Sequence, residues 1–95
     1  MDSYLHTWKN KPVILTDHAC EKAFEIQMSI WDIIQILQYS KDCLKDKREK
    51  NKFERCSTWK GHNIKIVFKK AYSGWTGCES WIIITIIQED KNNEF

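Results

Sequence analysis

Two side chains near the start of the sequence have the types and spacing of groups that act on a phosphate ester. His18 and Lys22 are four residues apart, so on an α-helix they share one face. An imidazole transfers protons near neutral pH, and the N–H groups of a first helical turn disfavour its charged form. An ammonium group one turn later is placed to bind a phosphate. The alternative is a histidine that packs against the helix start beside a solvated lysine.

A basic block in the second half of the chain supplies further candidates. Residues 41–70 hold eleven basic and four acidic residues, a net charge of +7, whereas residues 1–40 and 71–95 carry −2 and −3. Such a block neutralises phosphates; the alternative is a lysine-rich strand that discourages aggregation. Strand alternation places Lys65 and Lys69 on one face. We expect the RNA contacts to come from Lys69 and from five residues near it, namely Lys60, His62, Lys70, Trp59 and Tyr72.

These residue types fit RNA cleavage without a metal. Attack by the 2′-hydroxyl requires groups that remove its proton, protonate the leaving oxygen and stabilise the charged phosphorane, and His and Lys supply such groups. The sequence contains no Cys-x-x-Cys, His-Glu-x-x-His, dinucleotide-binding, P-loop or Gly-x-Ser-x-Gly motif. We therefore expect neither a metal nor a cofactor, and a structural zinc protein is a third, less favoured reading.

The first candidates are positioned by two predicted helices. Val13–Leu15 is a short apolar strand, and Thr16 or Asp17 caps the helix that follows, over residues 18–27. Its buried stripe is expected to comprise Ala19, Cys20, Ala23, Phe24 and Ile26. The second helix, residues 30–37, begins after Ser29, which pairs with Asp32 in a capping box, with Met28 and Ile33 forming a hydrophobic staple.

The second half of the chain predicts strands. Residues 53–59 alternate in polarity, and Lys60-Gly61 is a tight turn. In the next strand Ile64, Ile66 and Phe68 face inward, and after a loop at residues 73–77 the apolar run 81–87 predicts an inner strand. A weak strand is expected around Cys43 and Leu44.

Length and composition indicate one domain. The chain has 95 residues, 42% hydrophobic and 29% charged, which is typical of a globular protein. We expect an N-terminal arm at 1–12, which docks by Tyr4 and Trp8, a single α+β domain at 13–90 and a polar tail at 91–95. The longest apolar run is far shorter than the ~20 residues of a membrane span, and no export signal is seen. We therefore expect a cytoplasmic protein whose cysteines, at positions 20, 43, 56 and 78, are reduced.

The run Ile14-Leu15-Thr16-Asp17-His18-Ala19-Cys20-Glu21-Lys22, followed by Met28-Ser29 and the helix 30–37, resembles the opening of a small domain-of-unknown-function family. That family begins with an apolar pair, Thr, any residue, His-Ala, any residue and Glu-Arg, followed by Ile-Ser and a second helix. It is grouped with RelE, ParE and BrnT-like toxin folds. Gly61 before Ile64-Lys65-Ile66-Val67, and the final Ile83-Ile84-Thr85, also fit, so the resemblance covers about residues 13–89.

The resemblance implies an α+β fold with two N-terminal helices packed on a three- to four-stranded antiparallel sheet, as in RelE. It also implies RNA cleavage, on the ribosome or on free RNA, and an antitoxin partner. His18 matches the family histidine, Lys22 stands where arginine is usual, and Thr85 matches a hydroxyl of the last strand. Ile26 and Gln27 depart from a common arginine and the usual glycine, and loss of a guanidinium removes a bidentate phosphate contact.

We therefore expect a ribonuclease of the toxin type. His18 is the acid or base, Lys22 and Lys65 hold phosphate, and Thr85 orients the substrate. The alternative is a non-catalytic module that binds RNA or a protein through the same face. The nuclease hypothesis requires His18 and the lysines of the strand that follows Gly61 to meet at one groove.

Overall fold

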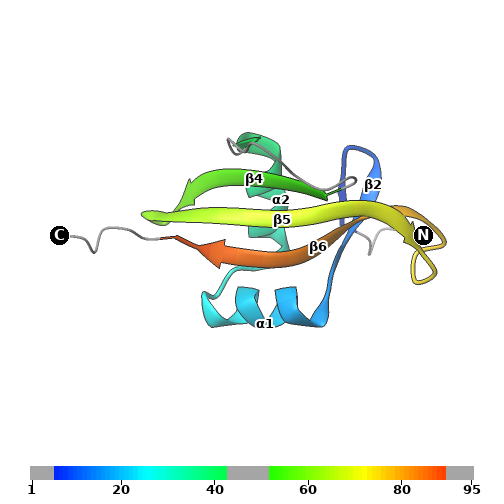
Figure 1. Cartoon of the computed structure of the whole chain (residues 1–95), viewed down its shortest axis with the longest axis horizontal. Coiled ribbons are helices and arrows are strands. Elements are labelled where there is room, and N and C mark those ends of the chain that lie inside the picture. Colours follow the sequence, from blue (N-terminus) through cyan, green and yellow to red (C-terminus); the bar gives the residue numbers. More distant parts are fainter. Residues whose placement is uncertain (1–5, 43–51, 90–95) are drawn as a thin grey trace.

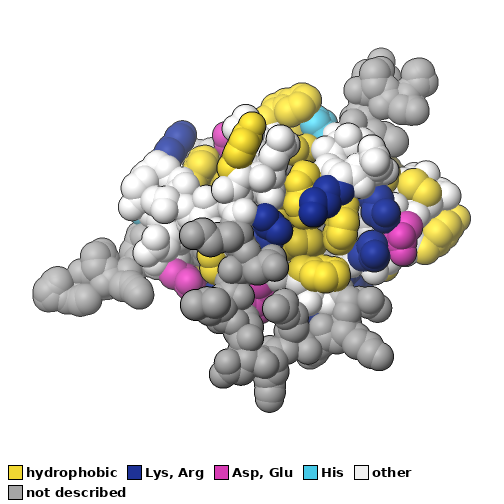
Figure 2. All heavy atoms as spheres, turned by 90° about the horizontal axis from the view of Figure 1, so that it is seen from above, with side chains coloured by type: hydrophobic (Ala, Val, Ile, Leu, Met, Phe, Trp, Pro, Cys, Tyr) yellow, Lys and Arg dark blue, Asp and Glu magenta, His cyan; other side chains and the backbone are white. Residues whose placement is uncertain are grey.

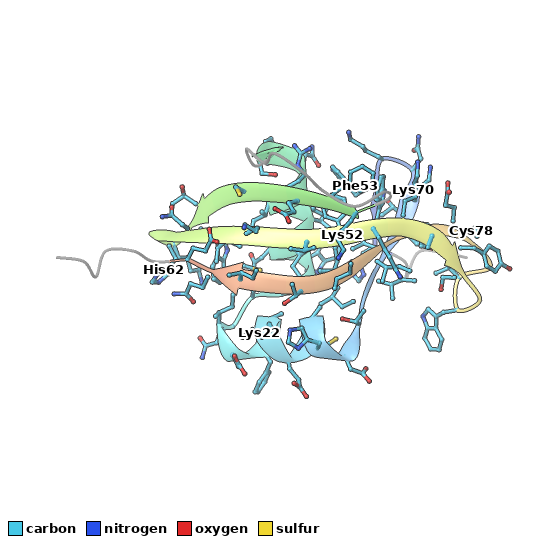
Figure 3. All side chains as sticks on the ribbon, viewed as in Figure 1. Lys22, Lys52, Phe53, His62, Lys70 and Cys78 are labelled. Atoms are coloured by element: carbon cyan, nitrogen blue, oxygen red, sulfur yellow. The ribbon has the colours of Figure 1, made fainter. Side chains whose placement is uncertain are left out.

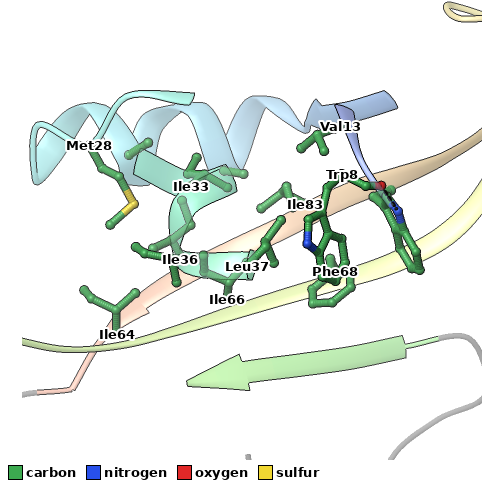
Figure 4. Packing of buried hydrophobic residues seen from close by; sticks show 14 residues of the cluster. Trp8, Val13, Met28, Ile33, Ile36, Leu37, Ile64, Ile66, Phe68 and Ile83 are labelled. Atoms are coloured by element: carbon green, nitrogen blue, oxygen red, sulfur yellow. Dashed lines mark hydrogen bonds between the residues drawn. The ribbon is translucent and has the colours of Figure 1, made fainter. Parts of the chain in front are cut away.

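The computed structural model describes residues 6–42 and 52–89, which form an α+β fold (Figure 1). Two helices and six strands follow one another as β1 (Thr7–Trp8), β2 (Lys11–Leu15), α1 (Asp17–Glu25), α2 (Ile30–Tyr39), β3 (Lys41–Asp42), β4 (Lys52–Trp59), β5 (His62–Ser73) and β6 (Cys78–Gln88). The strands lie in the order β1-β2-β6-β5-β4-β3 in a curled sheet. Both helices lie on one side of the long β5–β6 ribbon (Figure 4).

The sheet is mixed, which corrects the prediction of three to four antiparallel strands. Strand β2 pairs with β6 in parallel, and the pairs β6–β5, β5–β4 and β4–β3 are antiparallel. The two helices and the α+β class are confirmed. Strand direction could not be read from the sequence because a period-two pattern is the same in either direction. The two-residue strands β1 and β3 are too short to show any period.

Helix α1 begins where the pairing of β2 with β6 ends. Leu15 is opposite Ile83, and the next residue, Thr16, caps the helix by accepting the N–H of Ala19 at 3.0 Å. The Thr16 hydroxyl also donates to the carbonyl of Ile84 at 3.1 Å. This hydroxyl therefore confirms the predicted cap and fixes the start of α1 against β6, along which the helix then lies.

The predicted buried stripe of α1 is partly wrong. Ala19 and Ala23 are buried, but Phe24 is 83% exposed and Cys20 is also exposed. Two alanines leave the helix backbone close to β6, and the larger residues on the neighbouring face then extend past the sheet. Periodicity marks an apolar face but does not show how much of it a partner covers.

Helix α2 has the predicted start. The Ser29 hydroxyl accepts the N–H of Asp32 at 3.2 Å, and the Asp32 carboxylate accepts the N–H of Ser29 at 2.9 Å. Met28 and Ile33, the two residues of the expected staple, are both buried. The capping box therefore fixes the residue at which α2 begins.

The core lies between the helices and the sheet (Figure 4). Aromatic rings fill one end of it, where Trp8, Phe53, Phe68 and Trp81 contact one another with centroids 5.1–5.9 Å apart. The aliphatic part comprises Val13, Ala19, Ala23, Met28, Ile33, Ile36, Leu37, Ile64, Ile66, Ile83 and Ile86. The predicted inward positions of β5 are therefore confirmed.

Several expectations concern the N-terminal segment and the cysteines. Trp8 packs into the core at 7% exposure, whereas Tyr4 and the weak strand expected around Cys43 and Leu44 lie outside the described residues.

Cys56 is disulfide-bonded, so the expectation of reduced thiols is wrong for this residue. Cys20 and Cys78 are free and exposed, and Cys43 is not among the described residues. Neither helix is long and apolar enough to cross a bilayer.

Candidate functional site

The imidazole of His18 and the hydroxyl of Thr85 meet at the junction of α1 and β6. Nε2 of His18 lies 3.0 Å from Oγ1 of Thr85, in an exposed position. His18 is the second residue of α1, and Thr85 follows Ile84, whose carbonyl accepts the Thr16 hydroxyl. The helix cap and the catalytic candidate are thus positioned by the same contact between α1 and β6, over a sequence separation of 67 residues.

Lys22 lies one helical turn after His18, on the β6 side of α1 (Figure 3). Its Nζ is 3.7 Å from a carboxylate oxygen of Glu25, and its side chain is 40% exposed. An exposed pair of this kind exchanges readily with solvent and contributes little stability. The ammonium of Lys22 is therefore accessible to an anion bound beside His18.

Lys65 shares the open face of the sheet with Thr85 but is held by carboxylates. In the β5–β6 register Lys65 is opposite Ile87, and Thr85 is two residues away on the same face. Nζ of Lys65 lies 3.8 Å from Glu54 and 3.4 Å from Glu89, and the side chain is only 19% exposed. The two carboxylates oppose the approach of a phosphate, so Lys65 is near the histidine without being poised to bind an anion.

The predicted RNA contacts divide between the two ends of β5 (Figure 3). His62 and Lys70 are eight residues apart on this strand, which corresponds to about 26 Å. Lys70 lies over the ring of Trp81, with Nζ 5.8 Å from the centroid, while Lys69 projects from the opposite face. Tyr72 is 70% exposed near the β5–β6 turn. Lys69 is thus on the same face as Thr85, whose partner Val67 is two residues away, whereas Lys70 and Tyr72 are on the other face.

Three of the six predicted contacts, Trp59, Lys60 and His62, line a pocket at the β4–β5 turn, which we call the hairpin pocket. Its volume is about 240 Å³, and its walls are Glu25, Ile26, Gln27, Trp59, Lys60, His62 and Gln88. Nζ of Lys60 lies 4.9 Å from the centroid of the Trp59 ring, and Nδ1 of His62 lies 3.1 Å from Nε2 of Gln88. The end of α1 closes one side of this pocket.

The hairpin pocket lies beside the start of α2, where Asp32 has a lowered pKa. The largest cause is the backbone N–H that Ser29 donates to its carboxylate. The hydroxyl of Ser29 and the positive charge of Lys60 lower this pKa further, and Trp59 adds a hydrogen bond, while partial burial opposes them. The carboxylate of Asp32 therefore links the capping box to the β4–β5 turn.

A second cavity, of about 390 Å³, lies between α1 and α2. It is mainly apolar and is lined by Leu15, Cys20, Ala23, Phe24, Met28 and Ile30. The sequence offered no sign of it, since these residues match a buried stripe. In the hairpin pocket, Gln27 takes a left-handed backbone conformation that glycine favours, with φ of 58°.

The chemistry available at the α1–β6 junction is proton transfer. An imidazole nitrogen within hydrogen-bond distance of a hydroxyl is arranged to accept or donate a proton. Across residues 6–42 and 52–89, no group of three His, Cys, Asp or Glu side chains is arranged to hold a metal ion.

Comparisons with known proteins add no relative. The chain matches no protein-family model, no curated protein and no solved structure.

Proposed function

We propose that this protein is a metal-independent ribonuclease of the toxin type, with a RelE-like fold, and that it acts in the cytoplasm with an antitoxin as its partner. The single observation that carries the proposal is the 3.0 Å contact between His18 and Thr85. Two helices followed by the antiparallel strands β4, β5 and β6 support the comparison with RelE.

In the proposed reaction His18 removes the proton from a ribose 2′-hydroxyl. The 2′-oxygen attacks phosphorus, the bond from phosphorus to the 5′-oxygen breaks, and this oxygen takes a proton from the imidazolium or from water. The products are a 2′,3′-cyclic phosphate and a 5′-hydroxyl. Thr85 orients the imidazole and the substrate, and Lys22 exchanges Glu25 for the phosphate.

Lys65 has a smaller part in this proposal. Its ammonium is balanced by Glu54 and Glu89, so it approaches the phosphate only if it leaves one of them. We therefore expect substitution of Lys65 to affect cleavage less than substitution of Lys22.

The proposal is tested by incubating labelled RNA with the purified protein, with and without a chelator. We expect His18→Ala to lower the cleavage rate by about a hundredfold or more and Lys22→Ala by about tenfold. His6→Ala and Lys9→Ala are matched controls, because His6 packs on Trp31 and Lys9 lies over Trp8. Cleavage that survives His18→Ala, or that stops with the chelator, contradicts the proposal.

The alternative function is a non-catalytic module that binds RNA or a protein. The observation in its favour is the mainly apolar cavity beside the exposed side chain of Phe24, which suits a protein partner. RNA that binds in a fluorescence anisotropy titration but stays intact would favour this alternative.

A further inference from the structure

We propose that the hairpin pocket binds a guanine base. Its volume of about 240 Å³ is ample for one base, and the residues that line it include Trp59, Glu25, Gln27 and Gln88. The site is separate from the His18–Thr85 contact. That its base belongs to the RNA strand being cleaved rests on the function proposed above.

The backbone at this pocket favours a functional role for its side chains. Gln27 and Lys60 take left-handed conformations, with φ of 58° and 52°, which are unfavourable for residues other than glycine. The N–H of Gln27 donates to Phe24 and that of Met28 donates to Ala23, which is the helix ending that glycine usually completes. Lys60 owes this conformation to the two-residue β4–β5 turn, whereas Gln27 keeps a side chain at a helix end where glycine is usual, which points to a use for that side chain.

The pocket chemistry matches guanine better than the other bases. The Watson–Crick edge of guanine presents two neighbouring donors, and a carboxylate such as that of Glu25 accepts both. The amide of Gln27 can donate to or accept from the remaining edge, while the amide of Gln88 bonds to His62. The indole of Trp59, which already attracts the ammonium of Lys60, provides a surface on which a base stacks.

Glu25 and Lys22 join this pocket to the proposed catalytic site. The carboxylate of Glu25 is 3.7 Å from the ammonium of Lys22. From His18 to Glu25 the helix rises about 10 Å, and from Thr85 to Gln88 the strand advances about 10 Å. A single RNA strand along α1 and β6 can therefore place a phosphate at His18 and a base in the hairpin pocket.

The first test is calorimetric titration of the full chain with guanosine, adenosine, cytidine and uridine 5′-monophosphates. We expect guanosine monophosphate to bind at least tenfold more tightly than the others. Trp59→Leu should weaken its binding about tenfold or more through lost stacking, whereas Trp75→Leu, at a side chain 84% exposed near the β5–β6 turn, should not. Equal affinity for all four nucleotides, or no binding, overturns the proposal.

A second pair of variants separates binding from folding. Gln27→Gly and Lys9→Gly both place glycine at a left-handed position, φ 58° and 52°, and should raise the melting temperature. Only Gln27→Gly removes a side chain of the pocket, so it alone should weaken guanosine monophosphate binding. If the two variants bind alike, the pocket assignment is wrong.

Failure of the guanine-binding proposal can be distinguished from failure of the proposed ribonuclease function. Nucleotide binding is measured without any reaction and is expected to survive His18→Ala. Guanosine monophosphate binding without RNA cleavage supports the pocket and contradicts the ribonuclease, whereas cleavage without nucleotide binding does the reverse.

Discussion

Trp81 shows how one side chain joins distant parts of the chain. Its indole N–H donates to the carbonyl of Trp8 at 2.9 Å, in a buried position and across 73 residues. Its ring also contacts Trp8, Phe53 and Phe68. Packing and hydrogen bonding at this residue therefore hold β1 to the middle of the sheet.

Replacement of this indole should be costly. We predict that Trp81→Phe lowers the free energy of unfolding by about 2–4 kcal/mol, because it leaves the buried carbonyl of Trp8 without this donor and opens a small cavity. Trp75→Phe is the matched control, since Trp75 is 84% exposed, and it should change stability by less than about 0.5 kcal/mol. Urea denaturation measures the free energy of unfolding of each variant. Equal values for Trp81→Phe and Trp75→Phe would contradict a stabilising role of the buried contact.

At the scale of single residues, the structure brings some of the predicted site residues together and leaves others apart. His18, indicated by its place at a helix start, and Thr85, implied by the resemblance, lie within hydrogen-bond distance. As a lysine, Lys65 was expected to bind phosphate, but its ammonium forms ion pairs with Glu54 and Glu89. No sequence pattern shows which charged residues from other elements will face a given lysine.

The capping box of α2 couples helix stability to pH. The pKa of Asp32 is lower in the folded protein than its ordinary value of 3.8, chiefly because Ser29 donates its backbone N–H to the carboxylate. The unfolded chain therefore binds a proton more readily, and stability rises with pH in this range. The contribution is fully present above pH 3.8 and is lost as pH falls through the lower, folded pKa.

We predict that Asp32→Asn lowers the free energy of unfolding at pH 7 by about 0.5–1 kcal/mol. The difference in the free energy of unfolding between Asp32→Asn and the wild type should shrink below pH 3.8. Denaturation at several pH values measures this difference. Asp17→Asn is the control, because Asp17 lies in the first turn of α1, where Thr16 and not an aspartate is the cap. A difference that stays constant with pH would contradict the assignment.

The whole molecule depends on the core between its helices and its sheet. Ile66 is fully buried at the centre of β5, whereas Ile87 lies on the open face of β6 and is 36% exposed. Ile66→Ala should lower the free energy of unfolding by about 2–5 kcal/mol, and Ile87→Ala should cost about 1 kcal/mol or less. Thermal and urea unfolding measure the two losses of stability. A larger loss for Ile87→Ala than for Ile66→Ala would mean that the two faces of the sheet are misassigned.

In the described part of the chain, several basic residues of the segment 41–70 contact acidic or aromatic side chains. On the face seen in Figure 2, Lys and Arg side chains alternate with hydrophobic ones. Residues 41–70 have a net charge of +7, but among the described members Lys65 is held by carboxylates and Lys70 lies over an aromatic ring. For these described residues, the net charge of the segment does not by itself give the charge that is open to a polyanion.

The sequence by itself determined the local structure. The caps at Thr16 and Ser29, the Lys60-Gly61 turn and the inward positions of β5 follow from hydrogen bonding and periodicity within a few residues. Tertiary structure alone decided the parallel pairing of β2 with β6, the exposure of Phe24 and the separation of the two ends of β5. These features depend on contacts between residues far apart in the chain, and no local pattern of side chains encodes which distant surface will cover them.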